Sequence, residues 1–286
     1  MKQSFIILLL CLLMPLMMKG QGYFTIIDDD ISSIEAVTSV KDVADRFGVK
    51  ITYAATVSRL EKNRQLVETL LQFQEDGHQI VDHGWTHNFE VWGQPKWDIV
   101  KTELDKSSHL LDSLGFRNHD YLVYPFGKYT TETRNGIIPH VAERYKMAFD
   151  ARGHYCDLSN FNMHYIPRFA IRWHNNMWAV KYWIKRASKS DNWVVFLNHS
   201  GKSRDYKPEH LSDIIAYCQK LGMQNLTVED AYQKFGNLNA DKQEKNYTIG
   251  DEIMDVLFLH IVWILITVLF ITIVFIIAKF YLNGNQ

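Results

Sequence analysis

Three consecutive carboxylates, Asp28, Asp29 and Asp30, directly follow an apolar run, Tyr23 to Ile27, that predicts a strand. Neighbouring carboxylates repel one another, and burying them costs free energy unless they bind a cation or take up protons. A bound metal ion would remove this cost. The alternative, a set of N-cap residues for the next helix, accounts for one aspartate and leaves the other two unexplained.

A pair of histidines, His83 and His87, follows a second short apolar run, Gln79 to Val81. Residues four apart lie on one face of a helical turn, so both imidazoles could bind one ion, and imidazole suits zinc and related divalent metals. Such pairs also occur by chance on solvated helices. The spacing alone leaves both interpretations open.

Two weaker signals also follow predicted strands. In Tyr124-Pro125-Phe126-Gly127, proline and glycine force a turn, which can expose backbone N–H groups to a ligand. The apolar run ending at Asn198 leads into His199, which could serve as an acid or a base. Taken singly, an ordinary turn and a satisfied core histidine explain these features equally well.

The elements that would position these residues alternate between short apolar runs and helical periodicity, which predicts an α/β domain. Repeated βα units with parallel strands form a barrel or an open wound sheet, whose active face lies at the carboxyl ends of the strands. The expected strands are Tyr23 to Ile27, Val49 to Thr56, Gln79 to Val81, Tyr121 to Tyr124, Lys146 to Phe149, Ile166 to Ala170 and Trp193 to Asn198, and the expected helices are Ile34 to Phe47, Asn63 to Gln74, Trp97 to Leu114 and Pro208 to Leu221.

Composition limits the class of protein. The chain has 286 residues, is 47% hydrophobic and 13% aromatic, and is long enough for one large globular domain. Its 31 basic residues against 32 acidic ones give a net charge of -1, which does not favour nucleic acid as a partner. Cys156 and Cys218 in the folded part could pair or remain buried thiols.

Both ends of the chain carry membrane signals. Residues 1–22, with an apolar run from Phe5 to Met18, predict a signal peptide, although an uncleaved anchor is an alternative. Residues 256–278 are long and apolar enough for a transmembrane helix, and a core helix would show a polar face. We therefore expect a single-pass membrane protein with an extracytoplasmic domain, 23–236, a polar stalk, 237–255, and a short tail, 279–286.

The order of these signals resembles the polysaccharide deacetylase family, also called NodB-homology proteins or carbohydrate esterase family four. Thr25 to Asp30 is similar to the family's Thr-Phe-Asp-Asp-Gly, and the stretch from Gly77 to His87 is similar to its histidine motif. Tyr124 to Gly127, Ile166-Pro167-Arg168 and Leu197-Asn198-His199 resemble later motifs. Placing the family's aspartate pair on Asp28 and Asp29 keeps Ile27 in the apolar position of the first motif.

The resemblance implies a distorted parallel (β/α) barrel that binds a divalent metal through Asp29, His83 and His87. Zinc is the first expectation, with cobalt, nickel, manganese or iron as alternatives. It also implies that Asp28 is the general base, that Phe126 offers a backbone N–H to the oxyanion, and that His199 protonates the leaving amine. Three protein ligands leave a coordination position open for water, as an amide hydrolase of this kind requires.

The chain departs from the family pattern at two places. Asp30 replaces the family glycine, which adds a charge that could change the metal preference. The arginine that often opens the third motif is absent, and Arg168 could replace it as the partner of Asp28 or form a surface ion pair. We expect substrate contacts from Tyr124, Pro125, Phe126, Arg168 and Trp173.

These features predict hydrolysis of N-acetyl groups on N-acetylhexosamine units of a surface or cell-wall polysaccharide. Two alternatives remain open at this stage. The same site could act on O-acetyl esters or small amides, or the domain could be a membrane-tethered sugar-binding module without activity.

Overall fold

A computed structural model describes residues 22–127, 136–153, 155–159, 161–171, 177–189, 192–202, 206–238 and 268–273. The chain divides into two compact units, residues 1–244 and 245–286. Of the predicted span 256–278, only the helical residues 268–273 are described, and the predicted signal peptide lies outside the described residues apart from Gly22. Within the described parts, no helix has both the length and the apolar character that crossing a membrane requires.

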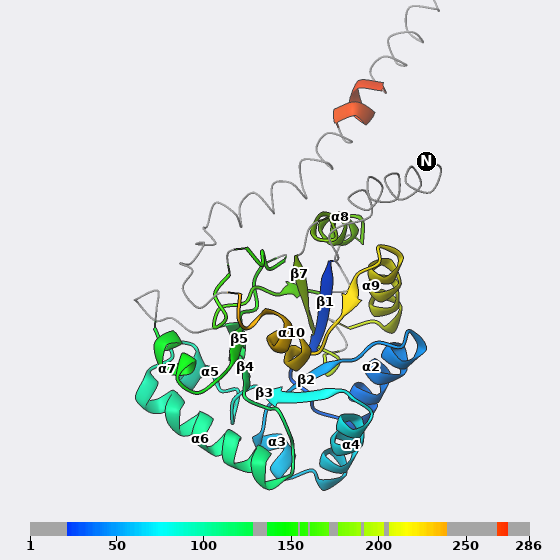
Figure 1. Ribbon diagram of the computed structural model, residues 1–286. Coiled ribbons are helices and arrows are strands. Elements are labelled where there is room, and N and C mark those ends of the chain that lie inside the picture. Colours follow the sequence, from blue (N-terminus) through cyan, green and yellow to red (C-terminus); the bar gives the residue numbers. More distant parts are fainter. Residues whose placement is uncertain are drawn as a thin grey trace, which may run out of the picture. The chain divides into compact units, whose positions relative to one another are not determined.

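The first unit is built on a curled, parallel sheet of eight strands (Figure 1). The strand order is β5-β4-β3-β2-β1-β7-β6, and β8 pairs with the start of β1. The bounds are β1 (Tyr23–Asp28), β2 (Thr52–Ala55), β3 (Gln79–Asp82), β4 (Tyr121–Val123), β5 (Met147–Phe149), β6 (Phe169–Ala170), β7 (Trp193–Asn198) and β8 (Gln224–Asn225).

One short stretch brings the two edges of the sheet together. Ile166 bridges to Phe149 of β5, and β6, which follows it, pairs with β7. All of these pairings are parallel, so the carboxyl ends of the strands lie at one edge. The prediction of a distorted parallel (β/α) barrel is confirmed in its architecture.

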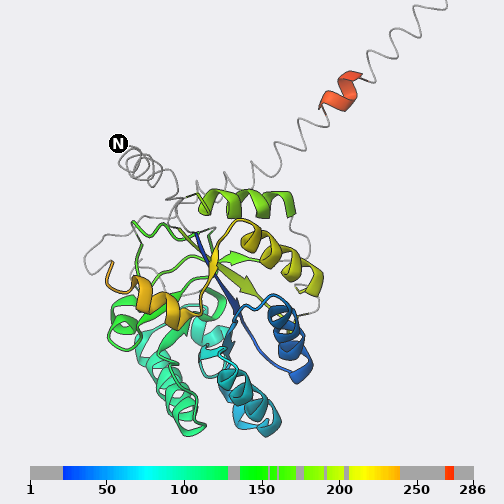
Figure 2. The same ribbon diagram turned by 45° about the vertical axis from the view of Figure 1, so that its right-hand side comes forward.

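Most helices lie outside this sheet, whereas the last one, Val228–Phe235, packs on its inner side with Tyr23 and Ile27 (Figures 1 and 2). Two begin at side-chain caps, because Ser33 accepts a hydrogen bond from the N–H of Ala36 and Asn63 accepts one from the N–H of Leu66. The helices are α2 (Ile34–Arg46), α3 (Ser58–Glu61), α4 (Arg64–Glu75), α5 (Phe89–Trp92), α6 (Trp97–Ser113), α7 (Ile138–Ala142), α8 (Met177–Ala187), α9 (Pro208–Lys220) and α10 (Val228–Phe235), with a 3-10 turn η2 (Pro125–Gly127).

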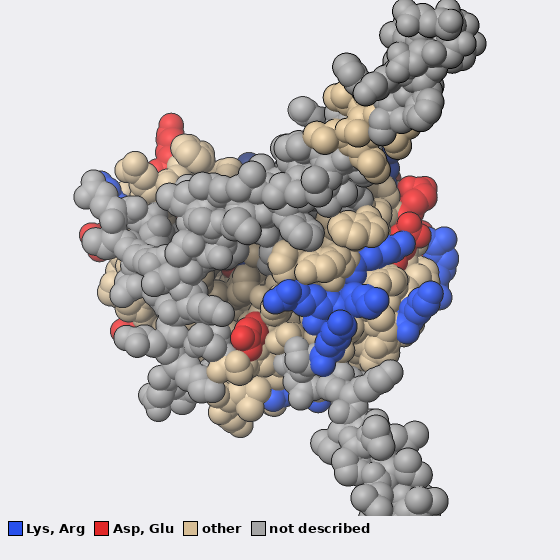
Figure 3. Space-filling view, turned by 90° about the horizontal axis from the view of Figure 1, so that it is seen from above, with Lys and Arg blue, Asp and Glu red and all other residues tan. Residues whose placement is uncertain are grey.

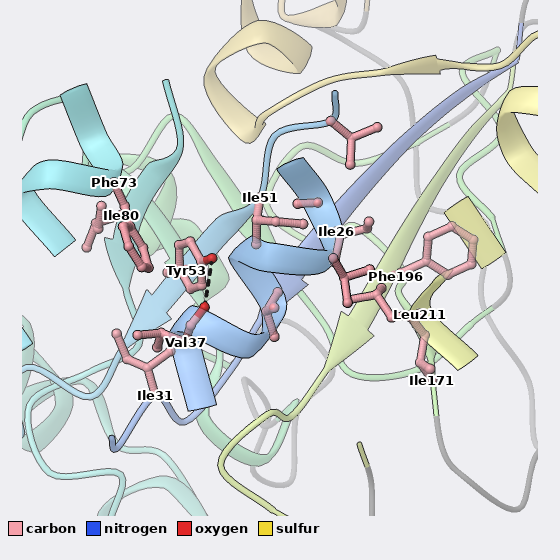
Figure 4. Close-up of a cluster of buried hydrophobic side chains, with 14 of the residues drawn as sticks. Ile26, Ile31, Val37, Ile51, Tyr53, Phe73, Ile80, Ile171, Phe196 and Leu211 are labelled. Carbon is pink, nitrogen blue, oxygen red and sulfur yellow. Dashed lines mark hydrogen bonds between the residues drawn. The ribbon is translucent and has the colours of Figure 1, made fainter. Parts of the chain in front are cut away.

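The pleat of β1 separates two apolar cores. Phe24 and Ile26 belong to the core between sheet and helices, where Figure 4 shows Ile26 beside Phe196 and the Tyr53 hydroxyl bonded to the carbonyl of Val37. Tyr23 and Ile27 belong instead to the core inside the barrel. Since side chains alternate along a strand, Asp28 continues the outer row of Phe24 and Ile26, and Asp29 continues the inner row.

A second buried carboxylate, Asp82 at the end of β3, holds the turn that carries His83. Its oxygens accept hydrogen bonds from the N–H of Gly84 at 2.7 Å, the Ser107 hydroxyl at 2.7 Å and the Tyr145 hydroxyl at 2.6 Å. Burial raises the pKa of Asp82, and these donors act against that shift. The network links β3 to α6 and to the chain before β5.

We expect Tyr145→Phe to lower the free energy of unfolding by about 1.5–3 kcal/mol, because hydrogen bonds to charged groups contribute about that much. The matched control is Tyr206→Phe, which removes a 3.2 Å contact with the neutral hydroxyl of Ser39 and should cost about 1 kcal/mol. Urea unfolding followed by circular dichroism measures both. Equal losses in the two variants would contradict a charge-assisted role for Tyr145.

Candidate active site

The carboxyl edge of the sheet brings together one aspartate and the two predicted histidines. Asp30 Oδ1 lies 3.7 Å from His83 Nε2 and 3.4 Å from His87 Nε2. The three residues form the cluster among the described residues whose ligand atoms could hold one metal ion. Tetrahedral ligands at about 2.1 Å from an ion lie about 3.4 Å from one another, so the spacing suits a small divalent cation.

The hydrogen bonding of His83 orients it as a ligand. Its Nδ1 lies 2.7 Å from the carbonyl oxygen of Val123, which can only accept, so Nδ1 carries the proton. The opposite nitrogen, Nε2, therefore presents a lone pair toward Asp30. Neither His83 Nε2 nor Asp30 Oδ1 has a hydrogen-bond partner, and both are buried. Both atoms carry lone pairs and face each other, and a cation bound between them would satisfy both.

Asp29 lies beside this cluster and is bound by an arginine. Arg168 Nη1 and Nη2 donate to its two oxygens at 2.8 and 2.9 Å, and both side chains are buried. Arg168 Nε also donates to the carbonyl of Asp150, which fixes the guanidinium. Burial alone would raise the pKa of Asp29, but Arg168 and the nearby histidines lower it below its usual range. Asp29 is therefore an ionised carboxylate, 4.0 Å from His83 Nε2.

Asp28 lies on the other face of β1, as the pleat requires. Its oxygens accept hydrogen bonds from Asn198 Nδ2 at 2.7 Å, from the Ser200 N–H at 2.8 Å and from the Ser200 hydroxyl. The side chain is fully buried, and burial raises its pKa to about 7 although these donors act against the shift. Asp28 thus ties the end of β1 to the chain on both sides of His199.

His199 and Lys202, which follow β7, lie on the other side of Asp30. His199 Nε2 lies 3.9 Å from Asp30 Oδ2, and Lys202 Nζ donates to the same oxygen at 2.6 Å. Burial lowers the pKa of His199, so the ring is neutral near pH 7. Asp30 Oδ1 therefore faces His83 and His87, whereas Asp30 Oδ2 binds the half-exposed Lys202.

The predicted turn after β4 contributes one exposed ring. Phe126 is 41% exposed and its ring lies 4.2 Å from that of His87, while Phe89 of α5, 64% exposed, packs edge-on against it at 5.3 Å. Tyr124 is buried and its hydroxyl donates to the carbonyl of His164, and Pro125 is also buried.

Backbone strain gathers at the same place. Asp30, His87 and Phe126 have φ angles of 56°, 51° and 59°, in the left-handed region that side chains other than glycine rarely adopt. Packing and hydrogen bonds must hold these three residues there, which is common at functional sites.

The structure thus places most of the predicted site residues together, in changed relationships. His83, His87, His199, Asp29, Phe126 and Arg168 gather at one edge, and Arg168 contacts Asp29 where Asp28 was expected. The histidines cluster with Asp30 where Asp29 was expected, so the geometry favours a register one residue later. The side chains of Tyr124 and Pro125 face the interior, and Trp173 lies outside the described residues. Phe89, Ser200 and Lys202 also lie at this edge, and they stand in none of the motifs from which the site was predicted.

We expect Arg168→Met to lower the free energy of unfolding by about 3–5 kcal/mol, because it leaves the carboxylate of Asp29 buried without its partner. Arg144→Met is the matched control, since Arg144 pairs with the half-exposed Asp105 and should cost about 0–1 kcal/mol. Urea unfolding without added metal measures both. Similar losses would show that Asp29 is not an ionised, buried group.

The sequence also matches the model of a known protein family. The family model for polysaccharide deacetylase matches residues 22–139, which contain β1, Asp28 to Asp30 and both histidines of the cluster. No curated protein matches the sequence.

Several solved structures share the fold at low sequence identity. A peptidoglycan N-acetylglucosamine deacetylase catalytic domain from Eubacterium rectale has a TM-score of 0.53 and 15% identity, covering 80% of this chain and 95% of that one. A family 4 acetyl xylan esterase from Clostridium thermocellum, in complex with a cobalt ion, has a TM-score of 0.55 and 13% identity, covering 74% and 91%. A mutant of a CE4 family pseudoenzyme with restored activity has a TM-score of 0.54 and 12% identity, covering 77% and 69%.

Identities this low establish the shared fold and nothing further, whereas the family model matches the segment that carries the aspartates and histidines. Residues 22–139, which carry the aspartates and both histidines of the site, thus match the polysaccharide deacetylases, a family of hydrolases.

Proposed function

We propose that the protein removes N-acetyl groups from N-acetylhexosamine units of a surface or cell-wall polysaccharide, with a divalent cation held by Asp30, His83 and His87. The observation that carries this proposal is the pair of buried, unpartnered donors, His83 Nε2 and Asp30 Oδ1, that face each other beside an ionised Asp29. When bound, the cation would polarise the acetyl carbonyl and acidify water. Two imidazoles and one carboxylate favour zinc, with cobalt, nickel, manganese or iron as alternatives.

The residues of the chain divide the proton transfers between them. Asp29 accepts the proton of the attacking water, and Arg168 keeps it ionised and fixes its direction by the two-point contact. His199 is neutral before the reaction. Its ring must therefore take up a proton during the reaction before it can protonate the leaving amine. The backbone N–H of Phe126, in the turn beside His87, offers a hydrogen bond to the developing oxyanion. Asp28 accepts hydrogen bonds on both oxygens, from Asn198 and Ser200, and holds the segment around His199 in place.

We further propose that the domain acts outside the cytoplasm. Residues 1–22 have the charge and apolar pattern of a signal peptide, and 256–278 have the length and composition of a transmembrane helix. The polar residues 237–255 would then be a stalk between the domain, 23–236, and the membrane. This arrangement would bring the site to polysaccharides at the cell surface.

Hydrolysis of O-acetyl esters is the second candidate, because a protein described as an acetyl xylan esterase shares the fold. Acetate release from N-acetylated and from O-acetylated oligosaccharides, measured side by side on the full chain with zinc, separates the two. Release from the N-acetylated substrate supports the proposal, and release from the esters alone overturns it. A metal-loaded protein that releases acetate from neither substrate would be a sugar-binding module.

Asp29 and Asp30 should separate into different roles when each is replaced. Asp30→Ala should lose the metal and the activity together, as should His87→Ala. Asp29→Asn should keep about one metal per chain while turnover falls about 10²–10⁴-fold, the usual contribution of a general base.

Metal analysis beside acetate release measures both effects. If Asp29→Asn empties the site while Asp30→Ala keeps its metal, the ligand is Asp29, as the first-motif comparison implied. Asp28→Asn is the control, because the proposal leaves its metal content unchanged.

The exposed ring of Phe89 should contribute to binding of the sugar. Aromatic rings stack on sugar rings, and a contact worth about 0.5–1.5 kcal/mol corresponds to a rise in KM of about 2- to 10-fold in Phe89→Ala with kcat little changed. Ile99→Ala on α6 is the control, since Ile99 is similarly exposed, at 50%, on a different element. Equal KM values for Phe89→Ala and the unaltered chain would remove Phe89 from the substrate site.

A further inference from the structure

We propose that the outer face of α8 docks onto the surface of an anionic membrane. This face, called the α8 face below, consists of Trp178, Lys181, Tyr182, Lys185 and Arg186 of α8, and of Lys189, two residues past the end of the helix. The proposal goes beyond the deacetylase chemistry, because it concerns how the domain is held at a membrane and needs none of the site residues.

The spacing of these residues places them on one side of the helix. Positions 178, 181, 182, 185, 186 and 189 recur every three or four residues, as one face of an α-helix does. Val180, Ile184 and Ala187 lie on the opposite side and are buried. The apolar side of α8 is therefore already packed against the domain, whereas Trp178, Lys185, Arg186 and Lys189 are exposed and Lys181 and Tyr182 are half-buried.

The charge of this face has one sign. Between Met177 and Lys189 the chain has Lys181, Lys185, Arg186 and Lys189 and no Asp or Glu, although the whole protein has a net charge of -1. Figure 3, which looks down on the side where α8 lies in Figure 1, shows Lys and Arg side chains close together. Such a cluster attracts anionic lipid headgroups.

Aromatic rings accompany these charges. Trp178 is 58% exposed, and its ring stacks with that of Tyr182 at 6.1 Å. Tyr182 in turn contacts Trp183 at 5.3 Å. Tryptophan and tyrosine prefer the headgroup region of a bilayer, where one part of the ring is apolar and the other reaches water. Lysines with interfacial aromatics are typical of helices that lie on a membrane surface.

The position of α8 in the fold favours a membrane over a polysaccharide as the occupant. The helix leads from β6 to β7, which are parallel strands, so it returns the chain from the carboxyl edge to the amino edge. At its end, Ser188 lies against Gly22, since a Cβ on Gly22 would be 2.9 Å from the Cα of Ser188. The apolar run 5–18 therefore precedes the domain by only a few residues at this point. A polysaccharide bound at the site would lie at the carboxyl edge, opposite to this end of α8.

Footprinting of lysines on the full chain tests the proposal. The protein is reconstituted into vesicles of phosphatidylcholine alone or with phosphatidylglycerol, treated briefly with an amine-reactive reagent, and analysed by mass spectrometry. Lys101 and Lys106 on α6 are exposed internal controls and show that the domain faces the reagent. Labelling of Lys181, Lys185 and Lys189 should slow on the order of threefold or more in the anionic vesicles only, and salt at about 1 M should remove the difference.

A charge variant checks the mechanism. Lys185→Gln with Arg186→Gln should reduce the protection of Lys181 and Lys189, whereas Lys101→Gln with Lys106→Gln should leave it unchanged. Equal labelling in the two kinds of vesicle would overturn the proposal. Protection by soluble polygalacturonate without protection by anionic vesicles would also overturn it and would assign the α8 face to an acidic polysaccharide.

Discussion

The site depends on the burial of three successive carboxylates at the end of one strand. A buried carboxylate costs several kcal/mol unless it is compensated, and neighbouring ones repel each other. The pleat of β1 directs Asp28 away from Asp29, so each group can be compensated separately. Asp28 accepts hydrogen bonds from Asn198 and Ser200, Asp29 binds Arg168, and Asp30 faces two histidines and Lys202.

The contacts that compensate these three aspartates also connect different elements of the barrel. The bonds of Asp28 connect β1 to β7, the bond of Asp29 connects it to the chain before β6, and the contacts of Asp30 connect it to the segment after β3. Because β6 and Ile166 bring the two edges of the sheet together, Arg168 reaches Asp29 only when the barrel has closed. The proposed chemistry requires an ionised Asp29, and the contact with Arg168 that keeps it ionised forms only in the complete fold.

Most of the fold could be predicted from the sequence, because period-two and helical patterns are local. The expected strands at Tyr23, Gln79 and Trp193, and the helices at Ile34, Trp97 and Pro208, lie within a few residues of the observed ones. The helix α8 was missed although Val180, Ile184 and Ala187 recur at helical spacing, a signal that the sequence contains. The helix α10 was missed although Thr227 and Asp230 form a capping box, a signal that the sequence contains.

The residues of the site could be predicted, but their register could not be settled by the motif. Keeping Ile27 in the motif's apolar position placed the metal ligand on Asp29. The alternation of β1 argues against the role of base that the same register gave to Asp28, since Asp28 shares the outer row with Phe24 and Ile26. The contacts of Lys202 and Ser200 could not be inferred from the sequence, because they depend on how the segment after β7 folds back over β1.

The most direct measurement is the identity of the metal's ligands in a crystal of the zinc-loaded protein, located by anomalous scattering at the zinc edge. This account predicts density for one ion about 2.0–2.2 Å from an oxygen of Asp30 and from Nε2 of His83 and His87, with Asp29 still bound to Arg168. An ion bound to Asp29, with Arg168 displaced from it, would contradict the account.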